Sequence, residues 1–467
     1  MLLRWPASFA ILLVPLTWSS AQSLQPHQQI AVDIYKELVE INTVTATGDT
    51  VRAAEAMAAR LRAAGFDGTD VQVLVSAPRK GNLVARLRGT GKRRPILLLA
   101  HTDVVDARPE DWSFDPFRLT ERDGYFYGRG TTDNKFMAAA FVANLVRYKL
   151  EGYTPERDII VALEADEEIG DANVLGIRWL LANHRSLIDA EFALNEGGRV
   201  GLKGGKPLWN SVQTAEKVFI SYKLEVTDRG GHSSLPTKDN PIHRLAEALA
   251  RLSRFSFPFK LNEITRAFFS RAAELENPQT AADMRAIAAG RPDLDALSIT
   301  RLSANPIYNA QMRTTCVATQ IQGGHAVNAL PQRASATVNC RVLPGEAIDE
   351  VHATLRGVLA DDGISITPFL GPVLSTPSPL HQEIMAAVEK LTAEFWPGTP
   401  VIPTMSAAGT DSTYLRNAGI PAYGHSGLAD DVDDFRAHGK DERVPVKSFF
   451  EGQEYLYRLV KILSGGG

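Results

Sequence analysis

Two patterns of hydrophobic and polar positions occur along the chain, and they predict two kinds of sheet. Up to about residue 216, and again from about residue 381, short continuous apolar runs alternate with segments of helical spacing. Continuous apolar runs are typical of strands that are buried on both faces of a parallel sheet. The runs at 95–100, 158–163 and 192–194, with a helix expected at 136–150, therefore predict a doubly wound, mainly parallel α/β sheet.

The segment between these parts has strictly alternating positions instead, as half-exposed antiparallel strands do. Its order of elements, β-α-β-β-α-β, is typical of a small ferredoxin-like α+β domain. We therefore expect an α/β domain at 22–216 and 372–467, with the α+β domain inserted at 217–371. The expected strands are 219–226, 315–321, 334–342 and 364–367, the helices are 241–252 and 348–359, and a helical insert covers 261–302.

The first residues have the composition of an export signal. Arg4 precedes the apolar run 9–14, and small residues at Ser19 and Ala21 follow at the spacing of a cleavage site. The run is too short to cross a bilayer, and no later stretch is long and apolar enough to do so. We expect a signal peptide at 1–21, export to a periplasm or the extracellular space, and no stable membrane span.

Composition narrows the range of partners. The 467 residues are 44% hydrophobic and carry a formal net charge of −4, with both signs spread along the chain. Without a basic stripe, nucleic acid is not an expected partner. Only two cysteines are present, Cys316 and Cys340, which excludes a disulfide scaffold. Both lie in predicted strands on either side of Asn328, so a disulfide and a pair of buried thiols both remain open.

Five polar residues form a candidate metal-binding set. His101, Glu168 and Glu196 follow predicted strands, Asp133 precedes a predicted helix, and His438 lies far downstream. In open α/β sheets, functional groups gather at the carboxyl ends of the strands. Imidazole and carboxylate together suit zinc, and also cobalt or manganese. One cation would take His101 and Glu196, the other would take His438 and Glu168, and Asp133 would bridge them.

Taken alone, each of these residues has an ordinary explanation. His101 could be a structural histidine, Asp133 a helix N-cap, and the acidic run at 166–168 a solvated loop. The acidic run at 430–434 is expected to be such a loop. The regular placement after predicted strands favours the metal site.

Two neighbours of the candidate ligands have expected roles of their own. Asp103 lies two residues after His101, so in an extended chain both point to the same side. Its carboxylate can then bind the far ring nitrogen of His101 and fix the tautomer. Glu167 points away from its neighbour Glu168 and can face the substrate as general base.

With these residues, the chain resembles the dizinc family of aminoacylases, succinyl-diaminopimelate desuccinylases, acetylornithine deacetylases and carboxypeptidases G. Within it, the chain is most similar to the branch of carboxypeptidase S and the secreted N-acyl-amino-acid hydrolases. The match covers nearly the whole mature chain. The motifs that carry it are His101-Thr102-Asp103, Gly128-Arg129-Gly130 with Asp133 and Lys135, Asp166-Glu167-Glu168, Asn195-Glu196-Gly197, His438, the segment 112–117 and Arg313-Thr314-Thr315.

The resemblance implies a dizinc catalytic domain with an inserted lid domain that can pair two copies of the chain. It also implies further site residues. His232 would stabilise the oxyanion, often across a dimer interface, and Asn328 and Arg341 would bind the substrate carboxylate. Gly409 and Thr410 would line the metal pocket. A turn histidine at His232 and a surface ion pair at Arg341 are the ordinary alternatives.

Two positions depart from the family pattern. Asn134 replaces a common Asp after the bridging residue, and Asn195 replaces an Asp before Glu196. Both leave the proposed ligands in place.

The implied function is hydrolysis of peptides or N-acyl amino acids that carry a free carboxylate. A deacetylase or desuccinylase of a metabolic N-acyl amino acid is a close alternative. A non-catalytic binding protein on the same fold is a second alternative, although it would be expected to have lost Glu167 or a ligand. A serine hydrolase is disfavoured because 424–428 lacks the second glycine of a nucleophile elbow.

Overall fold

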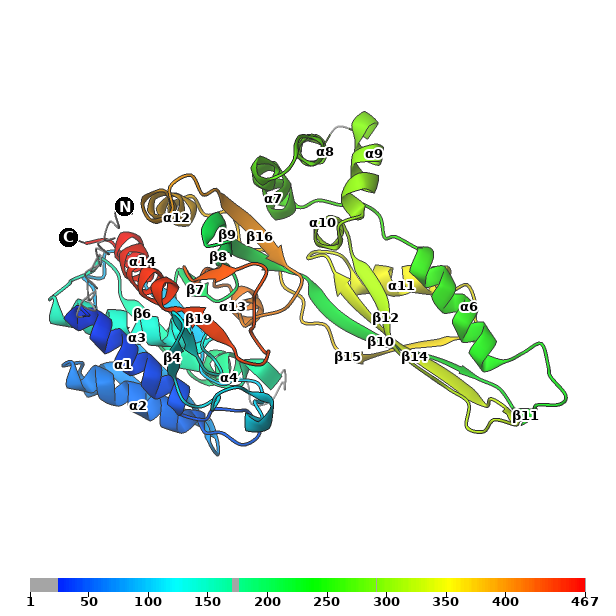
Figure 1. Ribbon diagram of the computed structural model, residues 1–467, viewed down its shortest axis with the longest axis horizontal. Helices are drawn as coiled ribbons and strands as arrows, with labels where there is room; N and C mark the ends of the chain where they lie inside the picture. Colours follow the sequence, from blue (N-terminus) through cyan, green and yellow to red (C-terminus); the bar gives the residue numbers. More distant parts are fainter. Residues whose placement is uncertain (1–23, 170–175, 291, 467) are drawn as a thin grey trace, which may run out of the picture.

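The computed structural model describes residues 24–169, 176–290 and 292–466. Figure 1 shows two bodies side by side. One contains a large sheet with its helices, and the other contains a smaller sheet with its own helices. The predicted signal peptide lies outside the described residues. Among the helices of the described ranges, none has the length and apolar character that crossing a membrane requires.

The larger sheet has a parallel centre. Within the described ranges it contains β1 Val71–Ala77, β2 Lys80–Leu87, β3 Ile96–His101, β6 Ile159–Glu164, β7 Phe192–Asn195, β8 Val200–Lys203, β9 Lys206–Glu216, β16 Val401–Ser406, β17 Ala422–Gly424 and β18 Ala429–Asp431. The order is β1-β2-β6-β3-β7-β17-β9-β8-β18, with β16 beside β9. Strand β3 runs parallel to β6 and β7, and β7 runs parallel to β17.

Helices cover both faces of this sheet, as the continuous apolar runs predict. In β3, Leu98 and Ala100 pack into one core and Leu97 and Leu99 into the other, all of them buried. The first core takes α1 Pro26–Glu40, α2 Thr50–Ala63, α3 Lys135–Leu150, α12 Gln382–Phe395 and α14 Val446–Ser464. The second takes α4 Gly176–Asn183, α5 Arg185–Ile188 and α13 Ser412–Asn417. The doubly wound α/β prediction is therefore confirmed.

The smaller sheet has the predicted β-α-β-β-α-β order. Its elements are β10 Val218–Thr227, α6 Pro241–Arg254, β12 Thr315–Gly323, β14 Arg333–Val342, α11 Ile348–Leu359 and β15 Ser365–Leu370. The strand order is β12-β14-β10-β15, and each pair is antiparallel. Both helices pack on one face, where Leu245 and Leu355 meet Tyr222 and Val338. Alternate positions of β14 are buried, which explains the alternating pattern in the sequence.

The remaining elements extend these two bodies. The helical insert packs against β16 through Ile402. A two-stranded ribbon lies at the outer end of the smaller sheet, far from the larger one in Figure 1. The insert consists of α7 Glu263–Ala272, η4 Ala273–Leu275, α8 Pro278–Ala289, α9 Pro292–Ser303 and α10 Pro306–Met312; the ribbon pairs β11 Gly231–His232 with β13 Ala329–Leu330. The short elements η1 Gly68–Asp70, η2 Pro109–Asp111, β4 Thr120–Arg122, β5 Tyr125–Tyr127, η3 Glu167–Ile169 and β19 Arg443–Pro445 complete the described chain.

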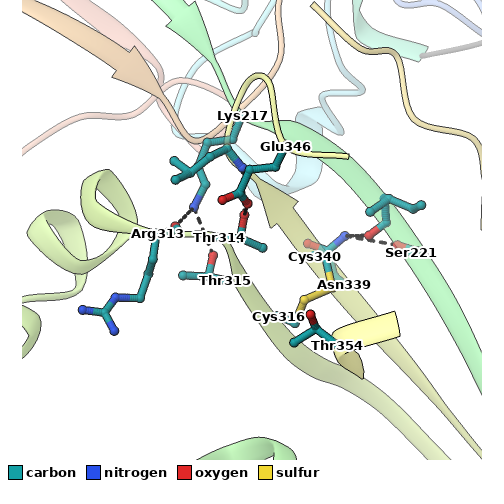
Figure 2. Close-up of a disulfide and its surroundings, with 12 residues drawn as sticks. Lys217, Ser221, Arg313, Thr314, Thr315, Cys316, Asn339, Cys340, Glu346 and Thr354 are labelled. Atoms are coloured by element: carbon teal, nitrogen blue, oxygen red, sulfur yellow. Dashed lines mark hydrogen bonds between the residues drawn. A yellow bond between two sulfur atoms is a disulfide. The ribbon is translucent and has the colours of Figure 1, made fainter. Parts of the chain in front are cut away.

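A disulfide links the two strands that the cysteines were expected to occupy. Cys316 of β12 faces Cys340 of β14 directly across the ladder, and their sulfur atoms are bonded (Figure 2). The open choice between thiols and a disulfide is thus settled. Nearby, at the junction of the two sheets, the Lys217 amine donates to the Arg313 carbonyl oxygen at 2.8 Å.

The sequence patterns missed several strands. Strands β1, β8 and β9 lie towards the edges of the larger sheet or in its antiparallel part, where apolar runs are short or interrupted by polar residues. The acidic run at 430–434 is only partly a solvated loop. Its first residue, Asp430, lies in β18 and is 6% exposed.

Candidate metal centre

The parallel strands place three of the candidate ligands at the carboxyl ends of the central strands, which we call the edge of the larger sheet. His101 is the last residue of β3 and pairs with Glu164, the last residue of β6. The short helix η3, which carries Glu168, follows β6, and Glu196 follows β7 directly. Because the parallel strands end at the same level, residues separated by up to 95 positions come together there.

Asp133 lies between the two imidazoles. One of its carboxylate oxygens, Oδ1, lies 3.0 Å from His101 Nε2, and the other, Oδ2, lies 3.1 Å from His438 Nε2. His438 Nε2 also lies 2.9 Å from Glu168 Oε1, and His101 Nε2 lies 3.5 Å from Glu196 Oε2. The structure therefore brings all five predicted ligands together, with Asp133 between His101 and His438.

The loop that carries His438 reaches this edge from the far end of the sequence. His438 has a φ of +62°, in the left-handed region that few non-glycine residues adopt. The backbone therefore turns sharply at this residue, and the loop places its ring against Asp133 and Glu168.

The cluster holds more negative charge than its imidazoles can neutralise. Hydrogen bonds that the protonated His438 ring donates to Asp133 and Glu168 raise the pKa of His438 to about 10. Burial raises the pKa of Glu196 to about 7, and burial, reinforced by Glu196, raises the pKa of Glu167 well above its usual value. Burial opposes the charge on Asp133, but hydrogen bonds to His101 and His438 lower its pKa.

The donor set fits cations. The ligand atoms of His101, Glu167 and Glu196 lie within 4.8 Å of one another, as do those of His101, Asp133 and Glu168. Imidazole and carboxylate donors at this spacing can close around a divalent ion. A histidine binds metal in its neutral form, so metal binding releases the ring proton. Bound cations would therefore take over the positive charge that the protonated histidines otherwise supply to these carboxylates.

Asp103 supports both His101 and the turn after β6. His101 Nδ1 lies 3.0 Å from the Asp103 backbone carbonyl oxygen and 3.5 Å from its carboxylate. The carboxylate accepts the backbone N–H groups of Glu167 at 3.2 Å and Glu168 at 3.1 Å. The carboxylate is thus turned towards η3, and the carbonyl makes the shorter contact with the ring, whereas the sequence analysis expected the carboxylate to do so.

Glu442 is a supporting residue that the sequence pattern does not reveal. Its side chain is fully buried and accepts the backbone N–H groups of Gly130, Thr132 and Asp133 at 2.7–3.2 Å. It also pairs with Arg129 at 2.7 Å, and this guanidinium donates to the His438 carbonyl oxygen at 3.4 Å. One carboxylate therefore joins the loop of Asp133 to the loop of His438.

A cavity of about 360 Å³ opens in front of the cluster, and Gly409 and Thr410 line it as predicted. The Thr410 hydroxyl donates to Glu216 at 2.6 Å, and the Thr410 backbone N–H donates to the same carboxylate at 3.2 Å. These two hydrogen bonds hold the loop of Gly409 and Thr410 in place. Thr410 therefore forms part of the cavity wall, but its hydroxyl hydrogen is already donated to Glu216.

The other three predicted site residues lie outside this cluster. His232 and Asn328 are exposed and adjacent in the ribbon, where Ser233 N donates to the Asn328 carbonyl oxygen at 3.1 Å, at the outer end of the smaller sheet in Figure 1. Arg341 of β14 is closer to the cavity, because its guanidinium donates to the Ala407 carbonyl oxygen at 2.9 Å. Ala407 precedes the cavity-lining residues 408–410.

The contacts of His425 and Ser426 also argue against a serine hydrolase. The buried His425 ring contacts the Ser211 carbonyl oxygen and the Tyr455 hydroxyl, both at 2.8 Å. The Ser426 hydroxyl donates to the Gly198 carbonyl oxygen at 3.0 Å. Both ring nitrogens of His425 are therefore engaged elsewhere, and the ring does not act as a base for Ser426.

Known proteins share this sequence and fold. A sequence model described as peptidase family M20/M25/M40 matches residues 97–462. The Mus musculus protein named N-fatty-acyl-amino acid synthase/hydrolase PM20D1 is 28% identical over 379 residues, which cover 79% of this chain and 74% of that protein. Probable carboxypeptidase S-like 2 of Dictyostelium discoideum is 30% identical over 380 residues, covering 79% and 71%.

Solved structures show the same fold at low identity. An M20 family metallo-carboxypeptidase from Sulfolobus solfataricus has a TM-score of 0.65 and 18% identity, covering 92% of this chain and 98% of its own. Human carnosine dipeptidase 1 has a TM-score of 0.61 and 16% identity, covering 94% and 97%. The Bacillus subtilis YXEP protein, described as a dinuclear metal binding peptidase, has a TM-score of 0.60 and 13% identity, covering 94% and 98%.

Proposed function

Because this chain belongs to peptidase family M20/M25/M40, we propose that it uses two zinc ions to hydrolyse the amide bond of small peptides or N-acyl amino acids with a free carboxylate. It is a hydrolase of a metallopeptidase family, with relatives named as a carboxypeptidase and an acyl-amino acid hydrolase. One observation carries the proposal: the two oxygens of Asp133 face two different histidines, as a carboxylate shared between two cations does.

The residues would divide between the two ions as the sequence suggests. His101 and Glu196 would hold one, His438 and Glu168 the other, and Asp133 would bridge them. When bound, the ions supply Lewis acidity to the scissile carbonyl and lower the pKa of water. Cobalt and manganese fit the same donors.

Glu167 is the proposed general base. It lies beside Glu196 and His101 and lines the cavity. Burial raises its pKa, and a carboxyl whose pKa lies nearer neutrality can both accept and return a proton. Glu167 takes a proton from the attacking water and passes it to the leaving amine nitrogen. The Asp103 carboxylate accepts the backbone N–H of Glu167 and so holds Glu167 in place.

The smaller sheet is the proposed lid, with boundaries at 217 and 371. His232 would stabilise the oxyanion and Asn328 would contact the substrate. Within one chain both lie at the outer end of this sheet, so we propose that they reach the cavity of a second copy in a homodimer. Arg341, beside the cavity-lining loop, would bind the substrate carboxylate through its guanidinium. Residues 1–21 support export to a periplasm or the extracellular space.

The test compares amide hydrolysis with and without a chelator. Activity on N-acetyl amino acids should be lost after chelation and restored by zinc, cobalt or manganese. Glu167→Gln should reduce kcat by about 10²- to 10⁴-fold while bound metal, measured by elemental analysis, is unchanged. The control is Glu37→Gln, which removes a surface carboxylate paired with Arg60 at 2.8 Å. Full activity in Glu167→Gln would refute the mechanism, and metal binding without activity on any amide would favour a binding protein.

A further inference from the structure

The cavity in front of the cluster has one wall that the proposed mechanism does not use. Arg199, Phe435 and Leu428 line it together with the candidate ligands. Arg199 lies three residues after Glu196, in the turn that leads to β8. Because Arg199 belongs to the α/β body that carries the candidate ligands, its place in the cavity does not depend on the lid or on a second copy of the chain.

In the described part of the chain, Arg199 has no anionic partner within 4.0 Å, unlike Arg129, Arg416 and Arg436. Arg129 pairs with Glu442 at 2.7 Å, Arg416 pairs with Glu216 at 3.1 Å, and Arg436 pairs with Asp434 at 2.7 Å. Across the described ranges, the Arg199 guanidinium makes no ion pair and no hydrogen bond, and its contact is the Phe435 ring, 3.8 Å from the guanidinium carbon to the ring centroid. The half-buried guanidinium lines the cavity with donors that are not used within the protein, and a guanidinium binds a carboxylate through charge-assisted hydrogen bonds.

The acidic residue that acts on Arg199 electrostatically does not meet this need. Burial lowers the pKa of Arg199, and Asp430 only partly offsets the effect. Asp430 is buried in β18, no contact within 4.0 Å joins the two side chains, and burial raises the pKa of this carboxyl to about 6. Within the described ranges, no acidic side chain therefore pairs with the Arg199 guanidinium, which lines the cavity.

The contact with Phe435 holds the Arg199 guanidinium at the cavity wall. A guanidinium that lies flat on an aromatic ring keeps its N–H groups in its own plane, where they can bind a carboxylate through two hydrogen bonds. Arg341 is less free, because it donates to the Ala407 carbonyl oxygen and lies over Phe219 at 4.7 Å.

We propose that Arg199 is a specificity-determining residue that binds the carboxylate of the substrate in the cavity beside the scissile amide. The inference rests on the proposed amide hydrolysis and adds to it. It assigns recognition of the anionic end to the α/β body itself, with Arg341 of the lid as an additional contact. The α-carboxylate of an N-acyl amino acid is one carbon from the amide nitrogen, so both groups fit one cavity of this size.

The first experiment measures kcat/KM for an N-acetyl amino acid and for its C-terminal carboxamide, which lacks the charge. Arg199→Gln should raise KM for the carboxylate substrate by about 10- to 100-fold with a smaller change in kcat, and the preference over the carboxamide should fall by a similar factor. Arg199→Lys should keep part of this preference, because it keeps the charge but loses the two-pronged geometry. The matched control is Arg458→Gln, which removes a guanidinium stacked on Phe395 and outside the cavity.

The second experiment separates this inference from the proposed function. Calorimetry compares binding of the N-acetyl amino acid to zinc-loaded Glu167→Gln and to the double variant with Arg199→Gln, and circular dichroism verifies folding. If the wild type cleaves no amide but binding depends on Arg199, the proposed function fails and the inference stands. If the wild type cleaves amides but Arg199→Gln and Arg199→Lys keep the full preference for the carboxylate, the inference is wrong and the function stands. Equal binding, or no binding, to both calorimetry variants also overturns the inference.

Discussion

The edge of the larger sheet and the ribbon at the outer end of the smaller sheet both carry predicted site residues, but only the edge forms a cluster. His101 is buried, and Asp133, Glu168 and His438 make contacts of 2.9–3.1 Å across loops that are far apart in sequence. His232 is exposed, and among the described residues its Nδ1 hydrogen-bonds with the hydroxyl and backbone N–H of Ser234, two residues away.

This difference separates metal binding from turnover. The candidate ligands are assembled by strand ends and buried loops within one chain, so metal binding should not depend on the ribbon. The oxyanion contact proposed for His232 needs a second chain or a large movement of the lid. The two regions should therefore respond differently to substitution, and each prediction below tests that separation.

Among the substitutions that compare the two regions, the largest effect is expected at the ribbon. His232→Ala should lower kcat by about 10²- to 10³-fold, the usual loss when one oxyanion donor is removed, while metal content stays as in the wild type. Steady-state kinetics on an N-acetyl amino acid and elemental analysis measure the two quantities.

Mixing tests whether His232 acts on a second copy. His232→Ala and Glu167→Gln chains, combined under conditions that exchange subunits, should recover activity that neither has alone, because one site of the mixed dimer keeps both groups. A control mixes each variant with itself. Wild-type kcat in His232→Ala would show that the ribbon takes no part in the chemistry.

Much of the fold was predictable because it follows from local patterns. The runs at 95–100 and 158–163 are buried on both faces, and the alternating strand at 334–342 is buried on one face, so their sequences report their surroundings. Strand β9 was missed because its eleven residues change from partly exposed to fully buried along their length. Its pairing with β8, β16 and β17 depends on segments distant in sequence.

A smaller effect is expected at the buried support of the edge. Glu442→Gln keeps the size of the side chain but weakens its hydrogen bonds to the Asp133 loop and its pair with Arg129. Metal affinity and kcat/KM should each fall by about 10- to 100-fold, as is usual for residues that hold ligands in place. Metal titration with a competing chelator and steady-state kinetics measure these changes.

The response of the ribbon provides the contrast for Glu442. Asn328→Ala, at the outer end of the smaller sheet, is the control and should leave metal affinity unchanged. Unchanged metal affinity in Glu442→Gln would mean that the two loops hold their ligands without this carboxylate.

The candidate site was predictable only where a metal-binding type of residue lies at a recognisable place in the sequence pattern. His101 and Glu196 follow strand ends and so could be found from the pattern. Glu442 and Arg199 have no such signal, because the role of Glu442 depends on the N–H groups around it and the role proposed for Arg199 depends on its having no ion pair within the described ranges. Such roles arise from tertiary packing, which brings groups from separate loops together.

The smallest effect on activity, but a measurable one on stability, is expected at His425, a buried histidine near the edge that is not a candidate ligand. Burial lowers its pKa to about 4 from the ordinary value of 6.5, so the unfolded chain binds a proton more readily than the folded one. The free energy of unfolding should therefore fall as the pH drops from about 6.5 to about 4, by at most about 3 kcal/mol from this residue.

His425→Asn removes this dependence, and the exposed His232→Asn is the matched control. The difference between the wild-type and His425→Asn unfolding free energies, from urea titrations at several pH values, should shrink as the pH falls through this range. Taking the difference cancels groups of opposite sign, such as Asp430, whose pKa burial raises to about 6. A difference that stays constant from pH 6.5 to pH 4 would show that the buried ring between Ser211 and Tyr455 accepts a proton without loss. In that case the interior beside the cluster would be more polar than the contacts of His425 indicate.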